Sequence, residues 1–402
     1  MKYNKNKGIT LIALVVTIII LLILAGISIN MLTGQNGILN RAQEAKEKTE
    51  IAQEDENKKV QEYEDIINNY TGNLPTGGGT TPYLPGNTFF YKEGNLSTGL
   101  VIQDKNNNEY VWVEVPTTIY DNEIYNGNGA NKPNLSTDWE KIKNCLKEYT
   151  KDYSDENYND TNSNGIYTED YKNMLKSIYE NGGFWIGRYE VGVETEKNFR
   201  KEYTSVTSND RIVIKPNMYP YTNVKVEEAQ LLATKISNDN CTSSLIYGIQ
   251  WDLILKYIET KNLIAKEKLN NDSTTIGNSY DSELILNRGK FAQHNLFSNW
   301  YDYNSEEKTN LVTGNKKQVQ STSNDGIILT TGSSDKTNLQ NIYDIAGNVW
   351  EWTLEIIPEN NRYLCRGGSY ANKGTEYPAS SRSSVGEDGK AVFVGFRIGL
   401  WK

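Results

Sequence analysis

The chain has 402 residues, of which 42 are Lys or Arg and 51 are Asp or Glu, so its formal net charge at pH 7 is −9. This charge argues against a general nucleic-acid binder, because such proteins need a basic face that displaces counterions from phosphates. The single histidine, His294, excludes a multi-histidine site, and the three cysteines show no CxxC spacing, which nearly excludes a Cys/His zinc cluster. The length allows one large domain or two ordinary ones.

A basic and then strongly apolar segment opens the chain. Three lysines come before Gly8 within residues 1–8, and residues 9–29 read ITLIALVVTIIILLILAGISI. As a helix, this apolar run would span about 31 Å, enough to cross a bilayer core of about 30 Å. The preceding lysines predict that the N-terminus lies in the cytoplasm. The sequence therefore predicts a basic leader over 1–8 and a single transmembrane helix over 9–29.

This opening resembles the N-terminus of type IV pilins and pseudopilins, in which a short basic leader ends in Gly before an aliphatic or aromatic residue, Thr, Leu and Ile. The resemblance implies that prepilin peptidase cuts between Gly8 and Ile9, that Ile9 is then methylated, and that other pilin or pseudopilin subunits are partners. Most pilins have Glu as the fifth mature residue, whereas this chain has Ala13, which weakens the case for a major, self-polymerising pilin. An uncleaved membrane anchor is the alternative.

Two further segments separate this anchor from the rest of the chain. Residues 30–70 are predicted to form a stalk helix. Their apolar positions are sparse and several charged pairs lie four residues apart, so a solvated spacer is favoured over a coiled-coil seam. Residues 71–86 read TGNLPTGGGTTPYLPG and predict a flexible linker. The globular head is then predicted over residues 87–402.

Short strands, a few helices and a loop-rich second half indicate an α+β fold for the head. The runs rich in β-branched and aromatic residues, which predict strands, are 89–92, 99–104, 109–115, 184–191 and 393–400. The runs with helical patterns are 136–150, 168–181, 226–236 and 250–260. The polar region over 266–334 is expected to form long loops. In the last strand, Arg397 is expected to point away from the core face.

The most specific motifs lie near the C-terminus. They are NIYDIAGNVWEWTLE at 341–355, RYLCRGGSY at 362–370 and VGFRIGL at 394–400. Their order resembles the sulfatase-modifying factor family, which includes formylglycine-generating enzyme and has a C-type-lectin-like fold. Weaker similarity upstream extends the resemblance over most of residues 87–402. The Trp, Gly and Arg residues of these motifs are interpreted as packing and turn residues of that fold.

The family's known catalytic groups are missing from this chain. Formylglycine-generating enzymes bind copper through two Cys just after the RGGSY-type segment, and the matching stretch, residues 370–377, has Asn and Tyr but no Cys. Cys365 is interpreted as a buried small side chain. The related sulfoxide synthases need a multi-histidine iron site, which one histidine cannot supply. We therefore predict a non-catalytic protein, and a membrane-anchored enzyme of the formylglycine-generating type is the least favoured alternative.

The resemblance also implies a structural Ca²⁺ ion. Carried over residue by residue, its ligands are the carboxylates of Asp344 and Glu351 and the carbonyl oxygens of Gly347 and Val349. Ca²⁺ prefers oxygen ligands of both kinds. The alternative is a turn at Asp344 and a surface Glu351, without a metal.

Binding is the function that these observations leave for the head. The loop after Ser369 corresponds to the place where the family binds its substrate peptide. The candidate ligand-binding residues in it are Tyr370, Asn372, Tyr377, Ser380 and Arg382. They suit a glycan or a peptide, although a solvated loop without a ligand is the alternative.

We therefore expect a minor pilin or pseudopilin with a lectin-like binding head. It would lie in a bacterial cell membrane, with the head outside the cytoplasm or on a surface filament. A structural pseudopilin of a secretion or DNA-uptake filament, whose head has no ligand of its own, is the alternative.

Overall fold

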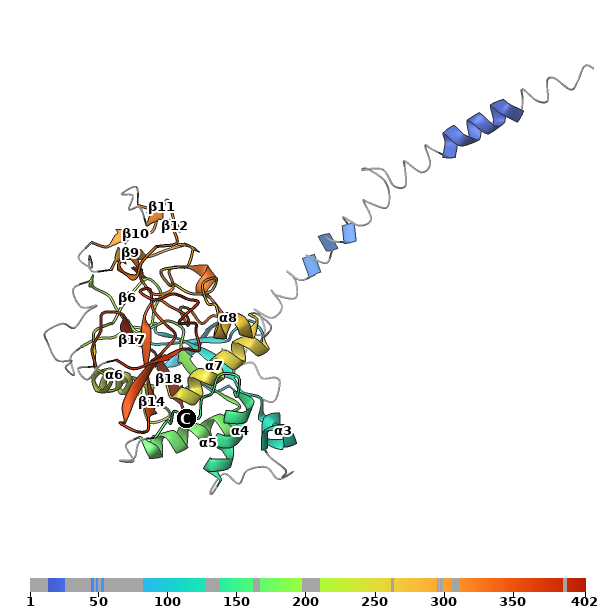
Figure 1. Ribbon diagram of the computed structural model, residues 1–402. Helices are drawn as coiled ribbons and strands as arrows, with labels where there is room; N and C mark the ends of the chain where they lie inside the picture. The colour runs from blue at the N-terminus through green and yellow to red at the C-terminus, as the bar shows by residue number, and fades with distance from the viewer. Residues whose placement is uncertain are drawn as a thin grey trace, which may run out of the picture. The chain divides into compact units, whose positions relative to one another are not determined.

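The chain divides into a first unit over Met1–Ile66 and a second unit over Ile67–Lys402. Figure 1 shows the computed structural model. It describes residues 14–25, 45–46, 48–49, 52–53, 82–126, 138–161, 167–196, 210–261, 264–294, 296, 299–305, 311–385 and 389–402.

Most of the described residues of the first unit form an apolar helix. Residues 14–25 are helical, and their large apolar side chains are each 48–67% exposed. Within the described parts of the chain, no helix is both long and apolar enough to cross a membrane. The predicted transmembrane run over 9–29 extends beyond this helix on both sides, and both Gly8 and Ile9 lie outside the described residues. Of the predicted stalk, residues 45–46, 48–49 and 52–53 are described, and they are helical.

A six-stranded sheet lies at the centre of the second unit, and every neighbouring pair of its strands is antiparallel. Its strands, in spatial order, are β1 (Phe89–Glu93), β2 (Val101–Asp104), β3 (Glu109–Glu114), β4 (Gly183–Gly187), β18 (Ile398–Trp401) and β7 (Thr242–Leu245). The strands predicted over 99–104 and 109–115 are confirmed as β2 and β3, which pair as an antiparallel hairpin. Trp112 and Trp185 are paired in register on β3 and β4, and their rings lie 5.1 Å apart in the core.

The helices of the second unit confirm much of the predicted pattern, and several of them pack against this sheet. They are α3 (Glu123–Asn126), α4 (Trp139–Tyr149), α5 (Thr168–Asn181), α6 (Val226–Ala233), α7 (Gly248–Thr260) and α8 (Lys266–Asn270). The bounds of α5 are those predicted, and α4 lies beside it (Figure 1). The predicted helix over 226–236 is α6 continued by the 3-10 turn η3 (Thr234–Ile236). The other 3-10 turns are η1 (Thr117–Asp121), η4 (Ser323–Asp325) and η5 (Asp335–Thr337).

A second sheet carries the C-terminal motifs. Its order is β16 (Arg382–Ser383), β15 (Arg362–Arg366), β14 (Trp350–Ile357) and β17 (Val394–Phe396), and the β14–β17 pair is parallel. The single strand predicted over 393–400 is therefore wrong. The chain leaves this sheet after β17, passes Arg397, and enters the six-stranded sheet as β18.

The region over 266–334 is not the set of long loops that was predicted. Besides α8 it contains β8 (Leu284–Ile285), β9 (Lys290–Gln293), β10 (Tyr301–Asp302), β11 (Val312–Thr313), β12 (Lys316–Lys317) and β13 (Ile327–Leu329). These strands form two three-stranded sheets around a small core that includes Phe291 and Leu329. Strands of two to four residues are too short to show an alternating pattern in the sequence. A further pair, β5 (Gly192–Val193) and β6 (Tyr219–Pro220), completes the described strands.

Candidate functional site

Arg397 links the two sheets from the interior, so its expected outward orientation is wrong. Its side chain is fully buried, and its Nε and Nη2 atoms donate to the carboxylate of Glu351 on β14 at 2.7–3.2 Å. It also donates to the carbonyl oxygens of Gly187, at the end of β4, and Tyr343, at 2.9 and 2.8 Å. Burial raises the pKa of Glu351, and the Arg397 guanidinium opposes that shift. This interior pair joins β14 to the point where the chain changes sheets.

The second carboxylate of the predicted calcium site also has protein donors. One oxygen of Asp344 accepts from the backbone N–H of Gly332 and the other from the hydroxyl of Thr337, both at 2.7 Å. Burial raises the pKa of Asp344. The described residues contain no group of three or more His, Cys, Asp or Glu that could hold a metal ion.

These contacts do not fit a Ca²⁺ ion held by Asp344, Gly347, Val349 and Glu351. A divalent ion on Glu351 would face the Arg397 guanidinium, which lies 2.7 Å from the same carboxylate. The alternative of a surface Glu351 is wrong, because its side chain is 1% exposed.

A third buried carboxylate, Glu190, belongs to this cluster and was missed. It accepts from the side-chain amide of Asn348 at 2.6 Å and from the backbone N–H of Val349 at 3.1 Å. Burial, followed by the charges of Asp344 and Glu351, raises its pKa well above its ordinary value. Glu190 lies within the strand predicted over 184–191 but beyond the end of β4 at Gly187, and nothing in its local sequence shows that it faces the motif over 341–355.

The predicted ligand-binding loop is only partly exposed. Tyr370 is fully buried, and its hydroxyl lies 3.0 Å from Nδ1 of His294, which does not fit its prediction as a ligand-binding residue. The Oδ1 atom of Asn372 accepts from the indole N–H of Trp350 at 2.8 Å. Tyr377 packs edge-on against Trp350, with ring centres 5.7 Å apart, and is 39% exposed. Asn372 and Tyr377 therefore lie together around Trp350.

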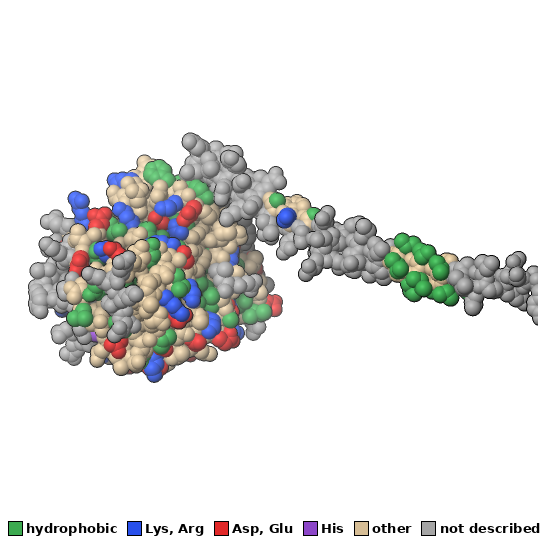
Figure 2. Space-filling model, turned by 90° about the horizontal axis from the view of Figure 1, so that it is seen from above, with side chains coloured by type: hydrophobic (Ala, Val, Ile, Leu, Met, Phe, Trp, Pro, Cys, Tyr) green, Lys and Arg blue, Asp and Glu red, His purple; other side chains and the backbone are tan. Residues whose placement is uncertain are grey.

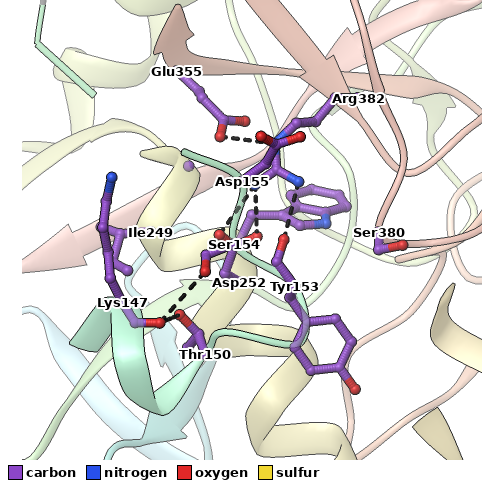
Figure 3. Close-up of polar contacts among 12 residues, drawn as sticks. Lys147, Thr150, Tyr153, Ser154, Asp155, Ile249, Asp252, Glu355, Ser380 and Arg382 are labelled. Carbon is purple, nitrogen blue, oxygen red and sulfur yellow. Dashed lines mark hydrogen bonds and ion pairs between the residues drawn. The ribbon is translucent and has the colours of Figure 1, made fainter. Parts of the chain in front are cut away.

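Arg382 belongs to an interior ion-pair network. Figure 3 shows its side chain pointing toward Glu355 and Asp252, with contacts of 2.9 and 3.1 Å. Arg366, which is fully buried, bonds to the same two carboxylates at 3.1 and 2.8 Å. Arg366 also donates to the carbonyl oxygen of Ser380 at 3.2 Å. Two guanidinium groups and two carboxylates thus satisfy one another, and Arg382 is a packing residue.

Asp160 lies beside this network and was not predicted. Its carboxylate accepts from the backbone N–H groups of Gly248 and Ile249, at 2.5 and 3.1 Å, which are the first two residues of α7. A carboxylate is favourable there because the N-terminus of a helix has unpaired N–H groups and a partial positive charge. Burial, and then the nearby charge of Glu355, nevertheless raise the pKa of Asp160 to about 7.

The three thiols are poorly placed for chemistry. Cys145, Cys241 and Cys365 are all buried and none forms a disulfide. Burial raises the pKa of each thiol, to about 11 for Cys241 and further for Cys365. The reactive form and the metal ligand is the thiolate. The interpretation of Cys365 as a buried small side chain is confirmed.

A large cleft lies elsewhere in the second unit. Its volume is about 1330 Å³, and it is lined by the start of β1, the turn between β2 and β3, residues 193–195, residues 210–215 and the end of η3. Acidic and basic side chains are interspersed on the described surface seen in Figure 2. Sequence reasoning missed this cleft because its walls come from segments that are distant in the chain and carry no motif.

Of the comparisons with known proteins, the match to a family agrees with the C-terminal motifs. No curated protein matches the sequence. Among solved structures, Treponema denticola variable protein 1 is 14% identical, with 55% of this chain and 85% of that chain covered and a TM-score of 0.29. PvdO from Pseudomonas aeruginosa is also 14% identical, with 55% and 82% covered and a TM-score of 0.31. Residues 161–399 match the family described as "Sulfatase-modifying factor enzyme 1-like domain". Because these residues are more than half of the chain, the protein belongs to the sulfatase-modifying factor family.

Proposed function

We propose that the chain is a non-catalytic binding protein displayed at the bacterial cell surface, a minor pilin or pseudopilin that carries a ligand-binding head. The observation that carries the non-catalytic part is the surroundings of Trp350. In the segment where the resemblance implies a copper-binding thiol pair, an amide and a phenol, Asn372 and Tyr377, contact the indole instead. Neither group can replace a thiolate as a copper ligand or redox partner.

The apolar helix of the first unit supports the membrane part of the proposal. Its side chains over residues 14–25 are apolar nearly all round, and a helix of this kind needs an apolar environment. With the basic leader before Gly8, it favours a single-pass anchor with a cytoplasmic N-terminus. Prepilin peptidase would act between Gly8 and Ile9, and other pilin subunits would surround the mature helix.

Burial of Tyr370 and pairing of Arg382 favour one second candidate. These contacts make Tyr370 and Arg382 of the predicted ligand-binding loop unavailable to a ligand, as expected for a structural pseudopilin whose head has no ligand. The two candidates differ in whether the head has another binding site.

Intact-mass measurement and an oxygen assay together test the proposal. The full-length chain, made in a bacterium that has prepilin peptidase, should begin at a methylated Ile9. Gly8→Ala should be processed better than Gly8→Val, because the peptidase needs a small residue there. The protein should consume no oxygen with copper and a Cys-containing peptide. An unprocessed N-terminus would refute the pilin part, and conversion of the peptide would refute the non-catalytic part.

A further inference from the structure

We propose that the 1330 Å³ cleft of the second unit binds an acidic oligosaccharide, a sugar chain that bears carboxylate groups. This inference rests on the proposed binding function and names its site and ligand class. Pockets for single small molecules usually measure about 300–1,000 Å³. The larger volume therefore favours an oligomeric ligand over a metabolite.

The chemistry of the walls favours a carbohydrate over an apolar ligand. Of the 19 described residues that line the cleft, 13 are polar or charged, and they include the amide of Asn106 and the hydroxyls of Thr88 and Thr195. Small-molecule pockets are lined predominantly by hydrophobic and aromatic side chains. Side chains that both donate and accept hydrogen bonds match the many hydroxyl groups of a sugar.

Among the described residues, the acidic ones that line the cleft are Asp104, Glu194 and Asp210, and all three have interactions within the protein. Asp104 accepts from the backbone N–H groups of Asn106 and Asn108 at 2.8 and 2.9 Å, and from the Asn108 amide at 2.8 Å. Glu194 lies 3.7 Å from Lys215. The Asp104 carboxylate thus holds the turn between β2 and β3, and the charge of Glu194 is balanced by its neighbour.

Two cationic side chains of the cleft have no carboxylate partner among the described residues. Lys105, in the turn, and Arg211 both line the cleft and are exposed. Among the described residues, neither forms an ion pair within 4.0 Å. This contrasts with the net charge of −9 for the whole chain. A carboxylate on the ligand would supply the missing partner, and hydrogen bonds between ionised groups are roughly twice as strong as neutral ones.

Calorimetric titration of the full-length chain in detergent tests the inference. The probes are tetragalacturonate, a hyaluronan tetrasaccharide, and the methyl ester of tetragalacturonate, which keeps the sugar skeleton but lacks the charges. The acidic probes should bind and the ester should bind at least tenfold more weakly. Arg211→Gln and Lys105→Gln should each weaken the acidic probe roughly tenfold. Lys336→Gln, an exposed lysine outside the cleft, is the matched control and should change nothing.

The inference is overturned if neither acidic probe binds, if the ester binds equally well, or if Arg211→Gln and Lys105→Gln bind like the parent. Equal binding of tetraglutamate would overturn the carbohydrate assignment. All of these outcomes leave the processing and oxygen assays unaffected, so failure here is distinguishable from failure of the proposed function.

Discussion

Replacing Arg397 by Met tests whether an interior ion pair, not a metal ion, holds β14 to the junction of the two sheets. Arg397 and Glu351 are 0% and 1% exposed, and their closest contact is 2.7 Å. Removing the guanidinium leaves a buried carboxylate without its counter-charge and takes a donor from two carbonyl oxygens. Breaking a buried pair in this way costs about 3–5 kcal/mol. We expect Arg397→Met to lower the melting temperature by roughly 10 °C.

A double-mutant cycle separates the pair from the rest of the network. Glu351→Gln alone should also destabilise, because it leaves the buried guanidinium without a counter-charge. The double variant should cost less than the sum of the two single variants, with a coupling of about 0.5–3 kcal/mol. Lys373→Met is the matched control. Its pair with Glu376 is similarly short, at 2.6 Å, but both partners are about half exposed, so its loss should leave the melting temperature nearly unchanged.

Calcium provides the result that would refute this reasoning. If Arg397 is the partner of Glu351, the parent protein should melt at the same temperature in EDTA and in millimolar Ca²⁺. An ion that bound only the folded state at 100 times its Kd would stabilise it by about 2.7 kcal/mol. A clear upward shift with Ca²⁺ that disappears in Glu351→Gln or Asp344→Ala would show that these carboxylates hold a metal after all.

Three further predictions concern buried titratable groups. Burial and the charge of Glu355 raise the pKa of Asp160 to about 7, above its value near 4 in the unfolded chain. The folded protein therefore binds more protons than the unfolded chain between about pH 4 and 7, and folding stability should fall as the pH rises through this range. Asp160→Asn should flatten this part of a plot of melting temperature against pH. Burial lowers the pKa of Lys317 to about 7, below its value near 10.4 in the unfolded chain. Folding stability should therefore rise between about pH 7 and 10. If a Lys317→Met variant keeps this rise, Lys317 is not the group that causes it. At pH 8, iodoacetamide should modify none of the three cysteines until denaturant is added, and rapid labelling of Cys365 in the native protein, seen by mass spectrometry, would show that its thiol is accessible.

Elements that depend on local pattern could be predicted from the sequence. The helix over Thr168–Asn181 has its predicted bounds because its apolar residues recur at helical spacing and Gly182 follows, with a positive φ of 68° that ends the helix. The hairpin of β2 and β3 follows from two apolar runs around a polar turn. In both cases the signal lies within a few residues of the element that it determines.

Contacts between distant segments could not be predicted in this way. The partners Glu351 and Arg397 are 46 residues apart, and a strand pattern places Arg397 on one face without showing that this face is also covered. Tyr370 illustrates the same limit, because its place after a glycine pair suggests a loop, whereas its side chain is buried against His294. A motif identifies a position in a family fold, but the exposure of that position depends on what other segments pack over it.

Some cationic side chains of this head are ion-paired within the protein, whereas others line the cleft without a described carboxylate partner. This difference is the physical reason for placing the proposed binding site at the cleft and not at the loop after Ser369. Arg366 and Arg397 are buried and the side chain of Arg382 is 9% exposed. Each is bonded to carboxylates, so a ligand could recruit one of them only by breaking ion pairs. Breaking such a pair costs about 3–5 kcal/mol, which is comparable to the whole binding free energy of a millimolar ligand, about 4 kcal/mol. Lys105 and Arg211 require no such loss, because among the described residues no carboxylate is paired with them. A carboxylate-bearing ligand therefore gains most where the protein has left its positive charge unpaired.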